Sequence, residues 1–355
     1  MPSATENSAL KTSGPDRGGR VAWIDSMKAI GIVLVVLGHT TGLPEAIRNQ
    51  IYAFHMPLFF WISGFLLSDA KLRTPLVPHV RLTARSLLVP YLVFALGSLA
   101  YWAVSHRYGS LAQTTFREAV SGIWIGHGPA LFINTPLWFF TAMFLLVVLY
   151  RVLSGWLDER ALLVLLALLA VPGVLLTRPD ARLPWNADLV AVVAIFYAVG
   201  RRSAPWMTAQ AFARIPLWAW IPALAVWVFL VQFNGEVNLN RSLFGQWPVL
   251  FYFNAFVGIY LLAWLCHALP VTVVTRWLAH NSLIIFPSHV VFFGLFTAVG
   301  VLVFGLRSTF KDAGIYCVPY TVAAILCAMP LSYLLPKILP SVFRPFPQAK
   351  RGARP

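Results

Sequence analysis

The chain contains a series of long apolar segments without a polar face, and this pattern restricts its fold more than any other feature. A helix on the surface of a soluble protein must alternate apolar and polar faces, because one side meets water. These segments are apolar all round, and about 20 such residues in a helix cross a bilayer. Of the 355 residues, 59% are apolar and 11% are charged, against about 25% charged residues in ordinary soluble domains. The sequence therefore predicts an all-α, polytopic integral membrane protein embedded in the lipid bilayer.

We expect about ten transmembrane helices in one membrane domain over residues 21–340. No span resembles another at a fixed period, so no internal repeat is predicted. Residues 1–20 are polar, with Gly, Pro and Ser, and predict a disordered cytoplasmic tail, while 341–355 predict a basic cytoplasmic tail. The apolar stretch after residue 20 lacks a small-residue cleavage site and is not expected to be a signal peptide. The predicted spans are 22–41, 51–68, 86–104, 136–153, 161–177, 188–200, 216–233, 248–268, 281–304 and 315–336.

The net charge of +15 follows the pattern of a topology signal. If the N-terminus is inside, 18 of the 27 Lys and Arg residues fall in the tails and inner loops. Positive residues are enriched on the cytoplasmic side of membrane proteins, so both termini are predicted to be cytoplasmic. The basic residues lie between apolar runs rather than on one soluble face, and no nucleic-acid partner is expected. The longest outer loop, about 104–135, is a candidate floor for an extracytoplasmic ligand.

Three ionisable residues lie within the first predicted span. Ionisable groups in a membrane cost several kcal/mol, so each one calls for an explanation. Lys28 and His39 are eleven residues apart, which places them about 20° apart around a helix. Asp25 precedes Lys28 by three residues on the same side and can neutralise it. The three form a polar stripe that must face the bundle interior or a wet cavity, unless Asp25 and Lys28 only anchor the helix end at the interface.

The second and ninth spans carry further polar residues. His55 begins the second span and is separated from His39 by a short loop, so the two imidazoles could share one cavity. Ser63 follows on the same span, next to a glycine, and small residues let helices approach closely. In the ninth span His289 lies seven residues after Ser282, about 20° from it around the helix. A histidine in mid-span needs partners for its ring nitrogens where water is absent.

Two arginines precede the third span at the predicted inner face. Arg81 and Arg85 could hold phosphates or act only as topology signals. Trp138 opens the fourth span, where an aromatic belt is the alternative explanation. The three cysteines show no metal or redox spacing, so no metal site is predicted.

These motifs together resemble the membrane acyltransferase-3 family. The resemblance rests on Ile24-Asp25 and Lys28 leading to Gly38-His39, then on His55-Met56-Pro57-Leu58-Phe59-Phe60 with Ser63-Gly64. Later landmarks follow in the same order across nearly the whole chain: Leu88-Val89-Pro90-Tyr91, Leu137-Trp138-Phe139, Asn281-Ser282 and His289. Within the family the chain looks most similar to short forms that O-acetylate exopolysaccharides, such as the xanthan acetyltransferases.

The resemblance implies a bacterial inner-membrane enzyme that moves acetyl from acetyl-CoA to a hydroxyl of an exopolysaccharide or its lipid-linked sugar precursor. Exopolysaccharide assembly machinery is then a candidate partner. His39 matches the family's usual catalytic candidate, with His289, His55, Asp25, Lys28 and Ser63 as further catalytic candidates. Arg81 and Arg85 match an Arg-x-x-Arg pair but with one extra residue between them.

The remaining candidates are Tyr91 for binding acetyl-CoA and Trp138, Asn281 and Ser282 for binding the sugar. Imidazole can act as a base or as an acyl-carrying nucleophile near neutral pH. A Ser or Asn donor can stabilise the oxyanion. Two alternatives stay open. One is transfer of another acyl group, such as succinyl, and the other is a transporter or flippase with a proton or ion path.

Overall fold

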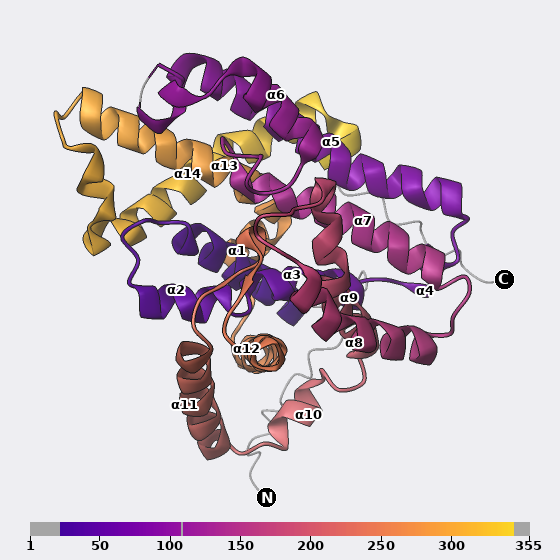
Figure 1. Ribbon diagram of the computed structural model, residues 1–355. Helices are drawn as coiled ribbons and strands as arrows, with labels where there is room; N and C mark the ends of the chain where they lie inside the picture. Colours follow the sequence, from indigo (N-terminus) through magenta and orange to yellow (C-terminus); the bar gives the residue numbers. More distant parts are fainter. Residues whose placement is uncertain (1–21, 108, 344–355) are drawn as a thin grey trace, which may run out of the picture.

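The computed structural model describes residues 22–107 and 109–343, so the predicted tail at 1–20 and residues 344–355 of the tail predicted at 341–355 lie outside these ranges. The described chain is built from helices, with one short antiparallel pair of strands (Figure 1). The elements are α1 (Ala22–Gly38), α2 (Glu45–Tyr52), α3 (His55–Phe65), α4 (Asp69–Leu72), α5 (Leu76–Ser105), α6 (Phe116–Ile125), α7 (Trp138–Leu153), α8 (Glu159–Leu176), α9 (Ala187–Arg202), α10 (Ala209–Ala213), α11 (Leu217–Asn234), β1 (Val237–Asn238), β2 (Leu243–Phe244), α12 (Pro248–Ala268), α13 (Val273–Leu302), α14 (Cys317–Ile338) and α15 (Pro340–Phe343).

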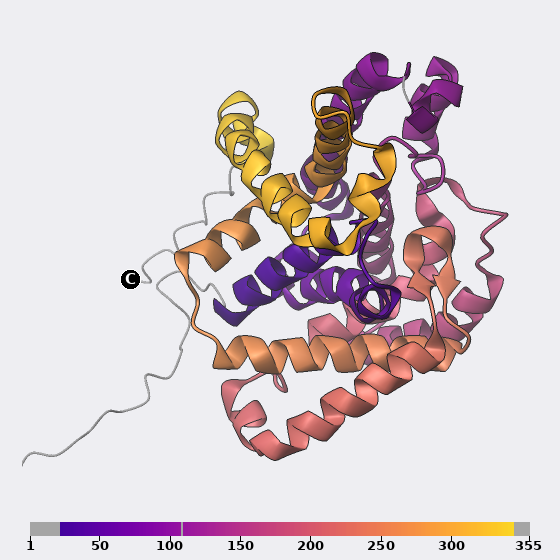
Figure 2. The same ribbon diagram turned by 90° about the vertical axis from the view of Figure 1, so that its left-hand side faces the viewer.

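Helix α1 lies at the centre of the bundle. It packs against α3, α12, α13 and α14, and Figures 1 and 2 show these helices around it. Its side chains Met27, Ile32, Val35 and Val36 are fully buried. A helix enclosed on several sides can carry polar residues that lipid would not accept. The position of α1 thus explains how its polar stripe is accommodated.

Six helices of the described chain are long and apolar enough to cross a membrane. They span Leu76–Ser105, Thr135–Leu153, Glu159–Leu176, Pro248–Ala268, Val273–Leu302 and Gly314–Ile338. The other predicted spans coincide with shorter apolar helices, of which α1 has 17 residues, α3 has 11 and α9 has 16. The chain is therefore an all-α membrane protein whose shorter helices lie among the longer ones.

The predicted span at 51–68 is divided in the structure. Helix α2 ends at Tyr52 and α3 begins at His55. Helix α2 carries Glu45, Arg48, Asn49 and Gln50, and these polar side chains do not suit the apolar interior. An α3 of 11 residues rises only about 16 Å, roughly half the thickness of the hydrocarbon layer. The break places His55 at the first turn of a buried helix, next to the end of α1.

Two glycines allow α3 and α9 to cross at close range. A Cβ on Gly64 would overlap the carbonyl oxygen of Tyr197, and one on Gly200 would overlap the carbonyl oxygen of Trp61. Small residues let helix backbones approach in membranes, where packing rather than the hydrophobic effect drives association. This contact fixes α3, and hence His55 at its start, against the rest of the bundle.

The connecting segments gather in two groups at opposite ends of the helices. In one group Arg201 donates to the carbonyl of Leu67 and pairs with Asp69 and Glu159, while Arg151 donates to the carbonyl of Thr74. In the other group Thr41 donates to the carbonyl of Lys311, Gln232 to that of Ala46, and Arg182 to that of Asn240. The first group joins segments predicted to lie inside, and the second joins segments predicted to lie outside.

Candidate active site

A cavity of about 210 Å³ opens at the end of the bundle where α1 ends and α3 begins. Its lining combines imidazole, phenol, amide and guanidinium groups with aromatic and aliphatic side chains. The lining residues are His39, Tyr52, His55, Met56, Thr135, Trp138, Asn238, Leu239, Asn240, Arg241 and Phe286. They come from five separate parts of the chain, so the fold rather than local sequence assembles the site.

His39 and His289 meet beside this cavity. His39 directly follows α1, is half-buried, and lines the cavity. His289 lies in mid-α13, is fully buried, and its ring centroid is 5.0 Å from that of His39. Neither ring nitrogen of His289 reaches a hydrogen-bond partner among the described residues. Since a buried polar group without a partner is costly, this histidine is unusual for a residue that serves packing alone.

His55 lies on the other side of Tyr52 from His39. The ring centroids are 4.7 Å apart for Tyr52 and His55 and 6.2 Å apart for His39 and Tyr52. The Nδ1 of His55 is 2.8 Å from the carbonyl oxygen of Ile51. In the neutral ring Nδ1 therefore carries the proton and donates it to this carbonyl, and Nε2 is the nitrogen able to accept. The short α2–α3 connection thus sets both the position and the tautomer of His55.

The segment that carries His39 is held by Arg48 of α2. One guanidinium nitrogen of Arg48 is 3.0 Å from the carbonyl oxygen of Thr41 and 3.1 Å from that of Leu43. These carbonyls follow the end of α1, where backbone acceptors have no helical partner. Arg48 thereby fixes the turn after His39 and brings a positive charge close to the histidines. An anion that develops in this cavity would be stabilised by that charge.

Asp25 and Lys28 lie at the opposite end of α1 from this cavity. Asp25 is buried and Lys28 is half-buried. Fourteen residues separate Asp25 from His39, which corresponds to about 21 Å along a helix. The polar stripe predicted on α1 therefore connects two regions and does not form one compact site.

Three other candidates from the sequence also lie away from the histidines. Ser63 follows His55 by eight residues, about 12 Å along α3, and Asn281 precedes His289 by the same interval on α13. Asn281 donates to the carbonyl of Trp277 at 2.9 Å, and Ser282 donates to that of Ala279 at 3.0 Å. None of the three lines the cavity. Trp138, by contrast, is buried and does line it.

The residues predicted to bind acetyl-CoA lie along α5. Arg81 and Arg85 are exposed near the start of this helix. Tyr91 is buried and donates to the carbonyl of Ile123 in α6 at 2.5 Å. The hydroxyl of Tyr91 is therefore engaged in joining α5 to α6, whereas the two arginines face outward from the bundle.

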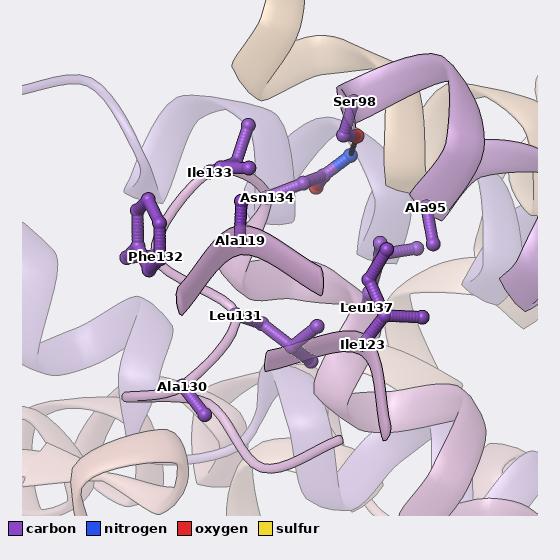
Figure 3. Close-up of a pocket in the computed structure, with 10 residues that line it drawn as sticks. All are labelled: Ala95, Ser98, Ala119, Ile123, Ala130, Leu131, Phe132, Ile133, Asn134 and Leu137. Carbon is purple, nitrogen blue, oxygen red and sulfur yellow. Dashed lines mark hydrogen bonds between the residues drawn. The ribbon is translucent and has the colours of Figure 1, made fainter. Parts of the chain in front are cut away.

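Asn134 is a structural contributor that the sequence analysis did not single out. Its side-chain nitrogen donates to the carbonyl of Pro287 at 2.7 Å and to Ser98 at 2.9 Å. Figure 3 shows its side chain directed toward Ser98, in the wall of a second, much smaller cavity of about 10 Å³. Pro287 lies two residues before His289 and cannot donate from its own nitrogen. Asn134 thus ties the 126–134 loop to the turn of α13 that carries His289.

The arrangement of His39, His55 and His289 at one cavity suits acid–base chemistry on a bound ligand. Imidazoles can take a hydroxyl proton, and Arg48 brings a positive charge near the same rings. The Tyr52 hydroxyl donates to the carbonyl of Gly38 at 3.3 Å and so holds the end of α1. No group of three or more His, Cys, Asp or Glu side chains within the described ranges could hold a metal ion.

Comparison with known proteins connects this site to a family. A family model described as "Acyltransferase domain" matches residues 21–335. Among curated proteins, the nodulation protein NolL of Sinorhizobium fredii (strain NBRC 101917 / NGR234) is 35% identical over 150 residues. That alignment covers 37% of this chain and 38% of the relative, so well under half of the relative is matched. No solved structure matches the chain significantly.

Proposed function

This chain belongs to the membrane acyltransferase-3 family, and from that membership we propose that it is an O-acetyltransferase. The donor is acetyl-CoA, and the acceptor is a hydroxyl of an exopolysaccharide or of its lipid-linked sugar precursor. The observation that carries the proposal is the cavity of about 210 Å³ lined by His39, His55 and Tyr52, with His289 packed on His39.

The proposed reaction assigns the proton to His39. The acceptor oxygen attacks the thioester carbonyl carbon while His39 takes the hydroxyl proton. The carbon–sulfur bond then breaks, and the CoA sulfur leaves with the proton that His39 returns. His289 orients the His39 ring, and His55 presents Nε2 to the cavity as a second acceptor. The positive charge of Arg48 stabilises the oxyanion formed at the carbonyl.

The proposed topology has about ten spans and both termini in the cytoplasm of a bacterial inner membrane. The contacts within the two groups of connecting segments support this alternation. The histidine cavity then lies toward the outer side, and Arg81 and Arg85 lie at the inner face near the CoA phosphates. The acyl thioester must reach into the bundle from the cytoplasm to meet the sugar beyond mid-membrane.

The test is transfer by purified protein. Acetyl-CoA labelled in the acetyl group is incubated with the protein and an oligosaccharide acceptor, and label on the sugar is measured by mass spectrometry. Succinyl-CoA is run in parallel, because a preference for it would replace acetyl with succinyl in the proposal. Absence of transfer from either donor, together with sugar movement across proteoliposomes, would assign the chain to transport instead.

A further inference from the structure

The polar wall of the histidine cavity is formed by a segment that has little support of its own. Asn238 ends β1, Leu239–Arg241 lie in the connection to β2, and all four line the cavity. The two strands have only two residues each and pair through Val237 with Phe244 and Asn238 with Leu243. A two-stranded hairpin is marginal in water even when longer. An external contact must therefore hold this wall in place.

One such contact is the guanidinium of Arg182, in the connection between α8 and α9, beside the burial of Val237, Leu239 and Phe244 in the core. Its three nitrogens each reach a different partner: Asp188 Oδ2 at 2.7 Å, the carbonyl oxygen of Asn240 at 2.7 Å and Asn186 Oδ1 at 2.9 Å. The Arg182 side chain is 3% exposed and that of Asp188 is 8% exposed. A planar guanidinium with every nitrogen engaged fixes direction as well as distance, which a lysine cannot do.

The Arg182 group is also linked to Trp138, another residue that lines the cavity. Asn186 donates from Nδ2 to the carbonyl oxygens of Gly126 and Trp138, both at 3.2 Å. Asn186 and the preceding Trp185 both have positive φ, at 56° and 59°. Such a backbone persists only where surrounding contacts determine it. Arg182 therefore contacts Asn240 directly and Trp138 through Asn186, so it connects two residues that line the cavity.

The chemistry of these cavity residues suits a sugar. Asn238, Asn240 and Arg241 supply amide and guanidinium groups, and Asn240 Oδ1 is buried without a hydrogen-bond partner among the described residues. Trp138 supplies an apolar aromatic surface in the same cavity. A sugar ring offers hydroxyl groups to the polar side chains and C–H bonds to Trp138, which is the division that a small-molecule site uses for orientation.

We propose that Asn238–Arg241 is the wall that recognises the sugar acceptor, and that Arg182 is the positioning residue that holds this wall to Asp188 and Asn186. Recognition of an acceptor rests on the proposed function, whereas the clamp itself does not. The proposal thus separates into a structural part and a binding part that can fail independently.

The structural part is tested by Arg182→Lys, which keeps the charge and loses the three-way fork. Amide hydrogen exchange of residues 237–244 in the purified protein should rise at least tenfold. Arg178→Lys is the matched control, because Arg178 lies in the same connection but pairs with Asp180 at the surface, with side chains 68% and 67% exposed. Equal exchange in the two variants would overturn the clamp.

The binding part is tested by Asn240→Ala, which removes the amide but keeps the carbonyl that Arg182 contacts. Exchange of 237–244 should stay at the wild-type level, while sugar affinity falls about tenfold or more. Gly128→Ala provides a second test of the same side chain if Asn240→Ala fails to fold, because its Cβ would displace the Asn240 side chain and leave Arg182 intact. Unchanged affinity in both variants would overturn the role of Asn240.

Binding is read by quenching of tryptophan fluorescence with two probes, cellotetraose and a tetrasaccharide that contains uronic acid. This readout needs no turnover, so a failure of acetyl transfer leaves it interpretable. If neither probe binds the wild-type protein, the assignment of Asn238–Arg241 to sugar is wrong. If a probe binds but no acetyl group is transferred, the wall stands and the proposed transferase activity fails.

Discussion

Substitution of Gly64 by Ala should loosen the crossing of α3 and α9. The added Cβ would overlap the carbonyl oxygen of Tyr197, and a backbone atom cannot move aside as a flexible side chain can. Overpacking of this kind costs about 1–3 kcal/mol, and contact with backbone favours the upper end of that range. Alanine returns about 1 kcal/mol through its helix propensity. We therefore expect a net loss of about 2 kcal/mol.

Gly97→Ala is the matched control for this prediction. Gly97 lies in α5, is exposed, and no heavy atom lies within 4 Å of where its Cβ would be. The same substitution there should be neutral or stabilising by up to about 1 kcal/mol. Unfolding of both variants by SDS titration from mixed micelles measures the difference, which should be about 2–3 kcal/mol. Equal unfolding free energies for Gly64→Ala and Gly97→Ala would refute the close crossing.

Three further predictions concern the two arginines proposed to bind acetyl-CoA, the membrane topology and one loop histidine. Replacing Arg81 and Arg85 by Ala should raise the KM for acetyl-CoA about ten- to a hundredfold, the value of a charge-assisted phosphate contact; an unchanged KM leaves them as topology signals. In a cysteine-free background, a thiol at Ala112 should react with an impermeant reagent from outside the cell, and labelling only after lysis would contradict the orientation. Burial, then the charge of Arg182, holds the pKa of His127 below its usual value. The neutral ring thus stabilises the folded loop at pH values above the ordinary pKa of histidine. This stability is lost as the pH falls through the lowered pKa of His127. Protection of the 126–134 loop from amide hydrogen exchange, corrected for intrinsic rates, should fall as the pH is lowered in the wild type but not in His127→Gln. Protection in the wild type that does not change with pH would contradict this prediction.

The sequence predicted the all-α membrane class because that property depends on composition and on runs of neighbouring residues. The same reasoning placed an apolar segment at each of the six long helices and at α1, α3, α9 and α11, although the segment at 51–68 also took in the last two residues of α2. The difference has a local cause: Ile51 and Tyr52 continue the apolar run in the sequence, whereas in the structure they end α2 and the chain breaks before His55.

The candidate site was only partly accessible from the sequence. His39, His55 and Trp138 could be selected because polar or aromatic residues at span ends stand out against an apolar background. Tyr52, Asn134 and Arg182 could not, because their importance arises from contacts between distant segments. The run Asn238-Leu239-Asn240-Arg241 between two apolar spans was the one local signal for the hairpin. Nothing in the spacing showed that it would face the histidines.

Some residues were selected from the sequence but lie away from the cavity. They are Asp25, Lys28, Ser63, Asn281 and Ser282. Each was selected for its polarity within a span, but polarity alone does not show how far along the helix a residue lies from the histidine cavity. Asn281 and Ser282 donate to carbonyls of their own helix, a common way to satisfy polar side chains in an apolar environment. Their roles in binding or catalysis remain predictions.

The central claim is that His39 performs acid–base catalysis in the cavity at the end of α1. The direct measurement is the rate of acetyl transfer to the sugar by purified His39→Ala, at matched protein level and with saturating acetyl-CoA. Loss of a general base lowers the rate about 10²–10⁴-fold, and His280→Ala, an exposed histidine of α13, should retain the wild-type rate. A His39→Ala rate within a few-fold of wild type, with His289→Ala or His55→Ala inactive, would contradict the account and move the catalytic base to α13 or α3.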